Sequence, residues 1–299
     1  MTAETTRTAD ATPTFEGRPL PDPTEPAWDQ GLAFDIQTLI DRRRVLKGIG
    51  LAGISLGIAA CAPGAGLSAS AGASASPSSS ASAAAAADCT TEIPEETAGP
   101  YPGDGSNGPD VLNQSGVVRK DITSSFGTST TVATGVPLTI RFAVLDVAKA
   151  CEPYAGAAIY AWHCDQAGRY SMYTQGVENE NYLRGVQAAG DDGIVEFTSV
   201  FPACYSGRWP HIHFEVYPSL EAATDSANHI ATSQIALPKD ISDEVYATSG
   251  YEQSVSNMNG LSLERDNVFG DDGGAHQLGI ISGSVADGLV VELAVPVEA

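Results

Sequence analysis

The chain has 299 residues, of which 42% are hydrophobic, and a formal net charge of -22 with only 15 Lys and Arg. This length allows one substantial domain with extra segments, or two modest domains. The acidity argues against a nucleic-acid partner, because proteins hold a phosphate backbone by neutralising it with basic side chains. It also gives no attraction to an anionic membrane surface, so membrane association would need a covalent or inserted anchor.

Export signals occupy the first part of the chain. Residues 41–47 read DRRRVLK and resemble a twin-arginine export motif, and an uncharged apolar stretch follows over residues 48–60. That stretch is too short to span a bilayer and suits the core of a signal peptide, although a buried helix with a basic cap is the alternative. The sequence Ile-Ala-Ala-Cys then ends at Cys61 and resembles a lipobox, which predicts lipidation of this cysteine.

We therefore expect residues 1–61 to be a twin-arginine-like signal region. The mature protein would be exported as a cell-surface lipoprotein on the outer face of the cytoplasmic membrane, held there only through a lipid at Cys61. A cleavage site within residues 83–87 would instead release a soluble, secreted form.

A low-complexity segment follows the export signals. Residues 65–87 are almost entirely Ala, Ser, Gly and Pro, with no large apolar side chain after Leu67. Such a segment cannot offset the entropy lost on ordering, so we expect a disordered tether over residues 62–90. The alternating apolar pattern of a folded chain begins after it, which predicts one globular domain over residues 91–299.

Four cysteines remain once Cys61 is set aside. Cys89, Cys151, Cys164 and Cys204 form an even set, which in an oxidising compartment indicates disulfides with three pairings open. None of them forms a C-x-x-C pair, which argues against a zinc site. Of the three pairings, we expect Cys89 with Cys151 and Cys164 with Cys204.

Short strands dominate the predicted secondary structure of the domain. An Asp-Gly pair at Asp287 and Gly288 indicates a tight turn between the last two of them. Only residues 241–246 have the character of a short helix. Many short strands with Gly and Asp turns predict an all-β sandwich with long loops and little helix. The expected strands are residues 138–145, 157–162, 194–200, 211–217, 232–237, 280–285 and 289–295.

Two histidines alternate within one predicted strand. His211 and His213 point to the same face, because successive side chains of a strand alternate. The intervening Ile212 and the following Phe214 point to the other face, so two imidazoles converge in front of an apolar layer. Such a pair predicts a metal site without naming the metal, since imidazole suits zinc, copper, iron and nickel alike.

Two tyrosines lie close to this pair in the sequence. Tyr205 lies in a turn just before the histidine strand, and Tyr170 follows the strand over residues 157–162 through a Gly-containing turn. Phenolate is a hard, anionic donor, so two tyrosines and two histidines form a ligand set suited to ferric iron.

These residues belong to two spaced motifs that together resemble the intradiol ring-cleavage dioxygenases, and most closely the exported group similar to the protocatechuate 3,4-dioxygenase β subunit. Residues 92–104, which contain the sequence TAGPY, resemble the start of the family domain. The likeness extends over roughly the last two-thirds of the chain, and so many fixed spacings form a strong signal. The motifs read Trp162-His163-Cys164-Asp165-x-x-Gly168-x-Tyr170-Ser171 and Phe197-x-x-Val200-x-Pro202-x-x-Tyr205-x-x-Arg208-x-x-His211-Ile212-His213.

The resemblance implies a β-sandwich of the intradiol dioxygenase type with a non-haem Fe(III) cofactor. Arg208 corresponds to the family arginine that stabilises negative charge on the substrate ring. Gln234 corresponds to a pocket glutamine, with a longer spacing from the histidines, and Tyr101 falls in the segment expected near the substrate. The tyrosine that the substrate displaces is the expected proton acceptor. The implied iron ligands are Tyr170, Tyr205, His211 and His213.

The implied reaction opens the ring of a catechol-type diol between its two hydroxyl-bearing carbons. Both atoms of O2 enter the product, a muconate-type dicarboxylate, and Fe(III) acts as a Lewis acid on the diol. The implied partners are a small aromatic diol and O2. Catechol, protocatechuate, hydroxyquinol and larger lignin-derived diols all remain candidate substrates.

Several simpler interpretations stand beside this one. His163 is expected to be structural, and His229 and His276 to be solvated. Glu215 shares a face with His211 and His213, so an Fe(II) triad of two histidines and a carboxylate is a rival arrangement. A surface-anchored β-sandwich that binds a partner without turnover is the alternative function, and a zinc hydrolase using the H-x-H pair is a third. The run over residues 271–274 is expected to be a surface turn rather than a calcium loop.

Overall fold

The computed structural model describes residues 14–15, 18–19, 89 and 91–298. The chain divides into two compact units, Met1–Ala81 and Ser82–Ala299. In the first unit the described residues are β1 (Thr14–Phe15) and β2 (Arg18–Pro19), which pair antiparallel.

The predicted signal region over residues 1–61 falls almost wholly outside the described residues, and so do Cys61 and the predicted tether except for Cys89. Within the described part of the chain, no helix has both the length and the apolar character needed to cross a bilayer.

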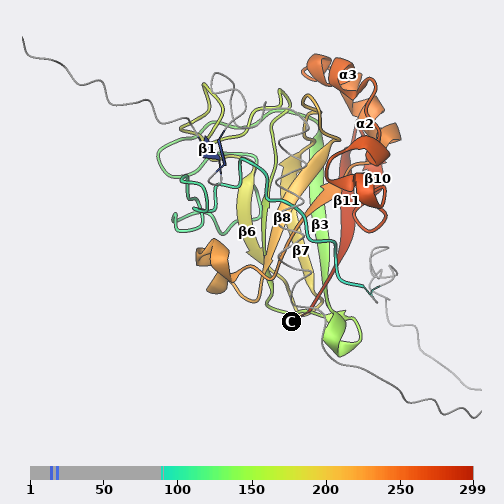
Figure 1. The fold of residues 1–299 in the computed structure, drawn as a ribbon. Helices are drawn as coiled ribbons and strands as arrows, with labels where there is room; N and C mark the ends of the chain where they lie inside the picture. Colours follow the sequence, from blue (N-terminus) through green and yellow to red (C-terminus); the bar gives the residue numbers. More distant parts are fainter. Residues whose placement is uncertain (1–13, 16–17, 20–88, 90, 299) are drawn as a thin grey trace, which may run out of the picture. The chain divides into compact units, whose positions relative to one another are not determined.

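The second unit is built on two β-sheets, as the strand pattern predicts (Figure 1). One sheet contains β3 (Pro137–Asp146), β4 (Glu152–Pro153), β7 (Ile194–Val200), β10 (Ile280–Ser284) and β11 (Gly288–Val297). The other has the order β6-β5-β8-β9, from β5 (Ala158–Trp162), β6 (Arg184–Ala188), β8 (His211–Tyr217) and β9 (Ala231–Ala236). β3 and β11 run parallel, and every other pair of neighbouring strands is antiparallel.

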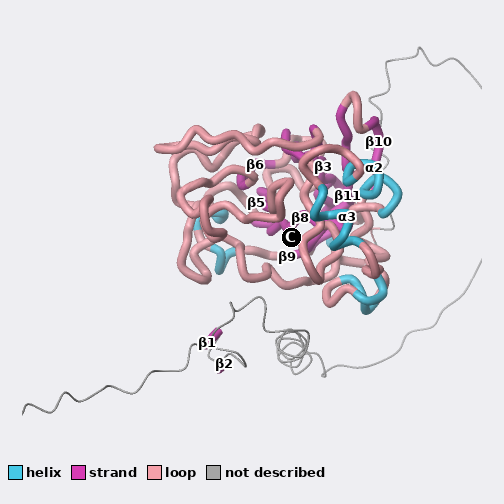
Figure 2. The backbone as a smooth tube through the Cα atoms, turned by 90° about the horizontal axis from the view of Figure 1, so that it is seen from above, coloured by secondary structure: helices cyan, strands magenta, loops and turns pink. Residues whose placement is uncertain are grey.

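The main core lies between the sheets and follows from strand alternation. Phe142 of β3 contacts Phe214 of β8 with 4.9 Å between ring centroids, and Phe197 of β7 joins them. A second apolar cluster covers the other face of β5 and includes Tyr160 and Trp162. Long loops surround β5 and β6 on the side away from α2 and α3 (Figure 2). The outer face of this sheet is therefore covered by loop residues.

The helical segments are short. The predicted helix over residues 241–246 is α2 (Lys239–Tyr246), which begins directly after Pro238, and α3 (Glu252–Met258) was not predicted. Strand β6 was also missed, because its sequence Arg-Gly-Val-Gln-Ala lacks a run of β-branched residues. The remaining helical turns are η2 (Val147–Lys149), η3 (Ala222–Thr224), η4 (Ser226–Asn228), η5 (Leu263–Arg265) and η6 (Phe269–Asp271).

The segment around α2 and α3 holds the loop that follows β7. The hydroxyl of Tyr246 donates to the carbonyl of Pro202 at 3.2 Å, and the hydroxyl of Tyr251 donates to the carbonyl of Phe201 at 2.7 Å. The backbone N–H of Cys204 donates to Ser254 Oγ at 3.1 Å. These bonds fix the backbone immediately before Tyr205.

Only one of the two predicted disulfides is present. Cys89 and Cys151 are bonded, whereas Cys164 and Cys204 are free, buried thiols, so their predicted pairing is wrong. Cys204 packs in the core between the sheets, whereas Cys164 packs in the apolar cluster on the outer face of the second sheet. Each thiol faces backbone carbonyls instead. Cys164 Sγ faces the carbonyl of Ala203, and Cys204 Sγ faces the carbonyls of Tyr205 and Arg208.

Candidate active site

Strand β8 presents its two histidines on the outer face of the second sheet. Ile212 and Phe214 point into the core between the sheets, as the alternation predicts. His211 and His213 are only 2% and 3% exposed. They are therefore enclosed between the sheet and the loops that cover it.

The two imidazoles are oriented by their surroundings. His211 Nδ1 lies 2.5 Å from the carbonyl oxygen of Trp209, which can only accept, so Nδ1 carries the proton and Nε2 presents a lone pair. The Nε2 atoms of His211 and His213 are 3.0 Å apart. The ring of His213 is stacked on Trp162, and a Cβ at Gly99 would lie only 3.3 Å from its Cε1. Gly99 has φ +72°, so both its conformation and this close approach favour glycine.

Both predicted tyrosines reach the same point. The hydroxyl of Tyr205 lies 3.1 Å from His211 Nε2. The ring centroid of Tyr170 is 5.9 Å from that of Tyr205 and 6.2 Å from that of His213. Tyr170 is 2% exposed, and by distance and angle its buried hydroxyl has no hydrogen-bond partner among the described residues. The structure thus gathers all four predicted ligands around one buried point.

Burial sets the protonation states of these four groups. It raises the pKa of Tyr170 well above its ordinary value and that of Tyr205 to about 12, although nearby Arg208 opposes the second shift. Burial also lowers the pKa of His211 to about 3, with Arg208 adding to the effect, and lowers that of His213. At neutral pH both phenols are protonated and both imidazoles are neutral.

These donors fit a metal cation. Two neutral imidazoles offer lone pairs, and a bound cation would favour ionisation of the two buried phenols, as Arg208 already does. The orphaned hydroxyl of Tyr170 is the observation that carries this fit, since a buried hydroxyl otherwise finds a partner. Tyr170, Tyr205, His211 and His213 could hold the metal, and phenolate donors suit Fe(III).

A cation and an amide lie beside this point. Arg208 Nη2 donates to Gln234 Oε1 at 2.7 Å, and Gln234 Nε2 donates to the carbonyl oxygen of Thr97 at 2.9 Å. Gln234 faces His213 across the ladder between β8 and β9, so the longer spacing in the sequence does not displace it from the site. Among the described residues, Arg208 Nη1 has no hydrogen-bond partner.

The aromatic ring of Tyr101 forms one side of the site. It is stacked on Tyr170 with 4.7 Å between centroids and meets Tyr173 edge to face at 5.2 Å. The guanidinium of Arg184 holds this segment, because its Nη2 donates to the carbonyl of Tyr101 at 2.9 Å and its Nη1 to that of Pro102 at 2.6 Å. Sequence reasoning missed Arg184, which lies on a strand that was not predicted.

Asp266 is a second residue that sequence reasoning missed. Its buried carboxylate accepts from Arg208 Nε at 3.0 Å and from the backbone N–H of Trp209 at 2.7 Å. No local motif marks this aspartate, which follows η5 and lies 58 residues from Arg208 in sequence.

Glu215 does not form a triad with the two histidines. It accepts from the hydroxyl of Tyr217 at 2.6 Å, and burial together with nearby Asp104 raises its pKa to about 8. Among the described residues, no three His, Cys, Asp or Glu side chains gather as a metal site. A site of two histidines and a carboxylate is therefore not supported.

The other histidines match the simpler expectations. His163 is buried, with Nδ1 at 2.8 Å from the carbonyl of Cys164 and Nε2 at 2.7 Å from Ser199 Oγ. Burial lowers its pKa to about 4, so it is a neutral, structural histidine. His229 and His276 are exposed.

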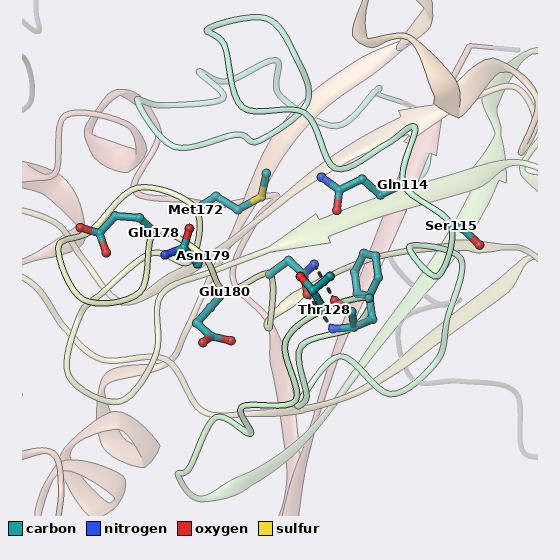
Figure 3. A pocket seen from close by; sticks show the side chains of 10 residues that line it. Gln114, Ser115, Thr128, Met172, Glu178, Asn179 and Glu180 are labelled. Carbon is teal, nitrogen blue, oxygen red and sulfur yellow. Dashed lines mark hydrogen bonds between the residues drawn. The ribbon is translucent and has the colours of Figure 1, made fainter.

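A cavity of about 410 Å³ lies beside the loop that carries Tyr170, and Met172 lines it (Figure 3). Several of its polar side chains are engaged within the protein. Glu180 accepts from the hydroxyls of Ser125, Ser129 and Thr131. None of the four side chains that meet at the histidines lines this cavity.

Comparisons with known proteins agree with this geometry. A family model described as Dioxygenase matches residues 107–231, a range that contains Tyr170, Tyr205, Arg208 and both β8 histidines. A chlorocatechol 1,2-dioxygenase from Rhodococcus opacus is 36% identical over 53 residues, 18% of this chain. The match spans only 21% of that relative's length.

Solved structures share the fold. An intradiol ring-cleavage dioxygenase from Tetranychus urticae matches with a TM-score of 0.56 and 24% identity, over 70% of this chain and 95% of that one. A second dioxygenase structure matches with a TM-score of 0.55 and 23% identity, over 70% and 94% of the two chains. At this identity the likeness establishes the architecture, which is that of these β-sandwich enzymes.

Proposed function

We propose that this chain is an intradiol ring-cleavage dioxygenase, which cleaves a catechol-type aromatic with O2 at a non-haem Fe(III) site; the family match over residues 107–231 and the similarity to a chlorocatechol 1,2-dioxygenase support this. The observation that carries the proposal is the meeting of Tyr170, Tyr205, His211 and His213 around one buried point. Both oxygen atoms would enter the product, so that a diol and O2 together give one muconate-type dicarboxylate.

The four side chains would hold the iron. When bound, Fe(III) supplies Lewis acidity toward the two hydroxyls of the diol. The imidazoles suit this role because burial keeps them neutral and the carbonyl of Trp209 fixes the tautomer of His211.

Tyr205 is the better placed of the two phenols to take up a substrate proton at its Oη. Tyr170 is buried beneath Tyr101, whereas Tyr205 is partly exposed and directly precedes the turn at residues 206–207. A phenol that can turn outward is able to leave room for a diol oxygen and to hold the proton that the diol loses.

Arg208 would stabilise the negative charge that develops on the ring. Its guanidinium is fixed in place by Gln234 and Asp266, and Nη1, which has no partner in the described part of the chain, would face a ligand. Preorganised charge of this kind contributes about 3 kcal/mol to transition-state stabilisation. Tyr101 and Gln234 would line the substrate pocket.

We also propose that the enzyme acts outside the cytoplasm. The twin-arginine-like motif and the lipobox at Cys61 support export, and a disulfide between Cys89 and Cys151 suits an oxidising compartment.

Oxygen uptake by the ferric-loaded protein tests the proposed function. A panel of catechol, protocatechuate, hydroxyquinol and larger diols would be supplied with ¹⁸O2, and products analysed by mass spectrometry. We expect uptake with at least one diol and both labelled atoms in a ring-opened dicarboxylate. Iron binding without uptake would favour a non-catalytic binding protein, and hydrolysis with zinc would favour the zinc enzyme.

A further inference from the structure

The carboxylate of Asp266 is a hydrogen-bond centre at the edge of the site. Its side chain is 1% exposed. Oδ2 accepts from Arg208 Nε at 3.0 Å and from the backbone N–H of Trp209 at 2.7 Å. Oδ1 accepts from Arg208 Nη2 at 3.3 Å and from the N–H groups of Val268 and Phe269 at 2.9 and 3.2 Å. Three backbone donors and one guanidinium therefore fix this carboxylate.

Asp266 fixes the guanidinium of Arg208 through two nitrogens. A carboxylate that accepts from Nε and Nη2 holds the plane of the guanidinium as well as its position. The same Nη2 then reaches Gln234 Oε1, and Nη1 is left without a partner among the described residues. Without Asp266, the guanidinium would keep its charge but lose the orientation that presents Nη1.

Asp266 is also linked to His211 through the backbone of Trp209. The N–H of Trp209 donates to Asp266, and its carbonyl accepts the Nδ1–H of His211 at 2.5 Å. The indole Nε1 of Trp209 donates to the carbonyl of Leu237 at 2.8 Å, which fixes the side chain of the same residue. The carboxylate and the imidazole are thus joined through the backbone of one residue, Trp209, whose N–H and C=O lie on either side of its Cα.

We propose that Asp266 is a positioning residue that orients both the cation Arg208 and, through the backbone of Trp209, the ring of His211. This inference rests on the proposed function and adds a residue that touches neither the metal nor the substrate. Asp266 thereby links the segment around η5 and η6 to His211, a proposed metal ligand on β8.

The substitution Asp266→Asn tests the proposal. An amide keeps the size of the side chain, but one of its ends donates, so it cannot accept from all five N–H groups. We expect kcat to fall about 100-fold with little change in KM, because misplacing a group that acts in the transition state has effects of this size. Ferric-ion affinity, measured by competition with a chelator, should fall about 10-fold because the support of His211 is weakened.

A double-mutant cycle separates positioning from general loss of stability. In an Arg208→Gln background, Asp266→Asn should change kcat by less than about threefold, because the cation that it orients is already gone. Arg208→Gln alone should leave the ferric-ion affinity unchanged. If the effects of the two substitutions on kcat are additive, Asp266 does not act by positioning Arg208. If the ferric-ion affinity of Asp266→Asn is unchanged, Asp266 does not support His211 through Trp209.

Asp146→Asn is the matched control. Asp146 is another buried carboxylate that pairs with a cation, Lys149, and with that residue's backbone N–H. It directly precedes η2, the green helical turn that Figure 1 shows at the opposite end of the sandwich from α2 and α3. This variant should keep the kcat and iron affinity of the wild type, and losses equal to those of Asp266→Asn would contradict the proposal.

Arg208→Lys covers the case in which Asp266→Asn does not fold. Lysine keeps the charge but cannot bond to the carboxylate through two nitrogens, so kcat should fall about 100-fold with iron affinity unchanged. A kcat like that of the wild type would overturn the proposal. If the wild type binds iron but turns over no diol, the proposed function fails. The ferric-ion affinities of the wild type and Asp266→Asn still decide whether Asp266 supports His211. A wild type that binds no iron contradicts both.

Discussion

The indole ring of Trp162 lies flat against the imidazole ring of His213, with 4.9 Å between centroids and 4° between ring planes. The two residues face each other across the ladder between β5 and β8. Trp162 is fully buried, so its ring has no freedom to move away. The contact fixes the plane of an imidazole whose own Nδ1 has no hydrogen-bond partner.

Replacing this indole should affect both stability and metal binding. Trp162→Ala should lower the free energy of unfolding by about 3–5 kcal/mol, because a large buried side chain is removed. It should also weaken ferric-ion binding about 10-fold or more, since the orientation of His213 is lost. Urea denaturation and chelator competition measure the two effects. Trp162→Phe keeps an aromatic ring and should reduce both the stability and the ferric-ion affinity less than Trp162→Ala does. Equal reductions in the two variants would contradict the role of stacking.

Removing a proposed ligand should abolish turnover. We expect Tyr205→Phe and His213→Ala to lose the visible absorption of the ferric protein and all detectable O2 uptake with a diol substrate, because each removes a donor from the metal. His229→Ala removes an exposed histidine that lies outside β8, and it serves as the control. Unchanged uptake in Tyr205→Phe or His213→Ala would rule out that residue as a ligand.

An ion-pair network on β3 and β7 should make stability depend on pH. Hydrogen bonds from Lys120 and Arg141 lower the pKa of Glu196 below its ordinary value. A lowered pKa means that the stabilisation is complete above the ordinary pKa of a glutamate, about 4.3, and is lost as the pH falls through the lower value in the folded state.

Glu196→Gln should therefore lower the free energy of unfolding by about 1 kcal/mol at pH 7, and the difference from the wild type should vanish in acid. Urea denaturation at a series of pH values measures it, with the exposed Glu244→Gln as control. A difference that grows as the pH falls would contradict the assignment.

The disulfide should contribute substantially to stability. It joins cysteines that are 62 residues apart, and closing a loop of this length in the unfolded chain corresponds to about 4 kcal/mol. The double variant Cys89→Ser and Cys151→Ser should lose about this free energy of unfolding, measured by chemical denaturation. Reduction of the wild type should give the same loss, and a reductant with no effect would argue against the bond.

Local patterns were sufficient to predict the strands and the histidines. Alternation alone places His211 and His213 on one face of β8, and apolar runs bounded by turns give most strands to within one or two residues. β6 and α3 escaped prediction because their sequences lack a periodic apolar pattern; in α3 the buried residues are one polar side chain, Ser254, and one apolar side chain, Met258.

The sequence alone does not predict which residues of distant segments come into contact. Asp266 is one acidic residue among many until the fold brings it to Arg208. The pairing of Cys164 with Cys204 was wrong because the sequence does not reveal that the two side chains pack in different apolar clusters. Gln234 could be carried over only by resemblance, and its place opposite His213 follows from the register between β8 and β9.

The most direct test of the account is the visible spectrum and iron content of the purified protein after ferric loading. If Tyr170 and Tyr205 are metal ligands beside the two histidines, the protein should bind a single ferric ion and become reddish through charge transfer from tyrosinate to iron. The band should weaken in both Tyr170→Phe and Tyr205→Phe. A protein that stays colourless and free of iron would contradict the account.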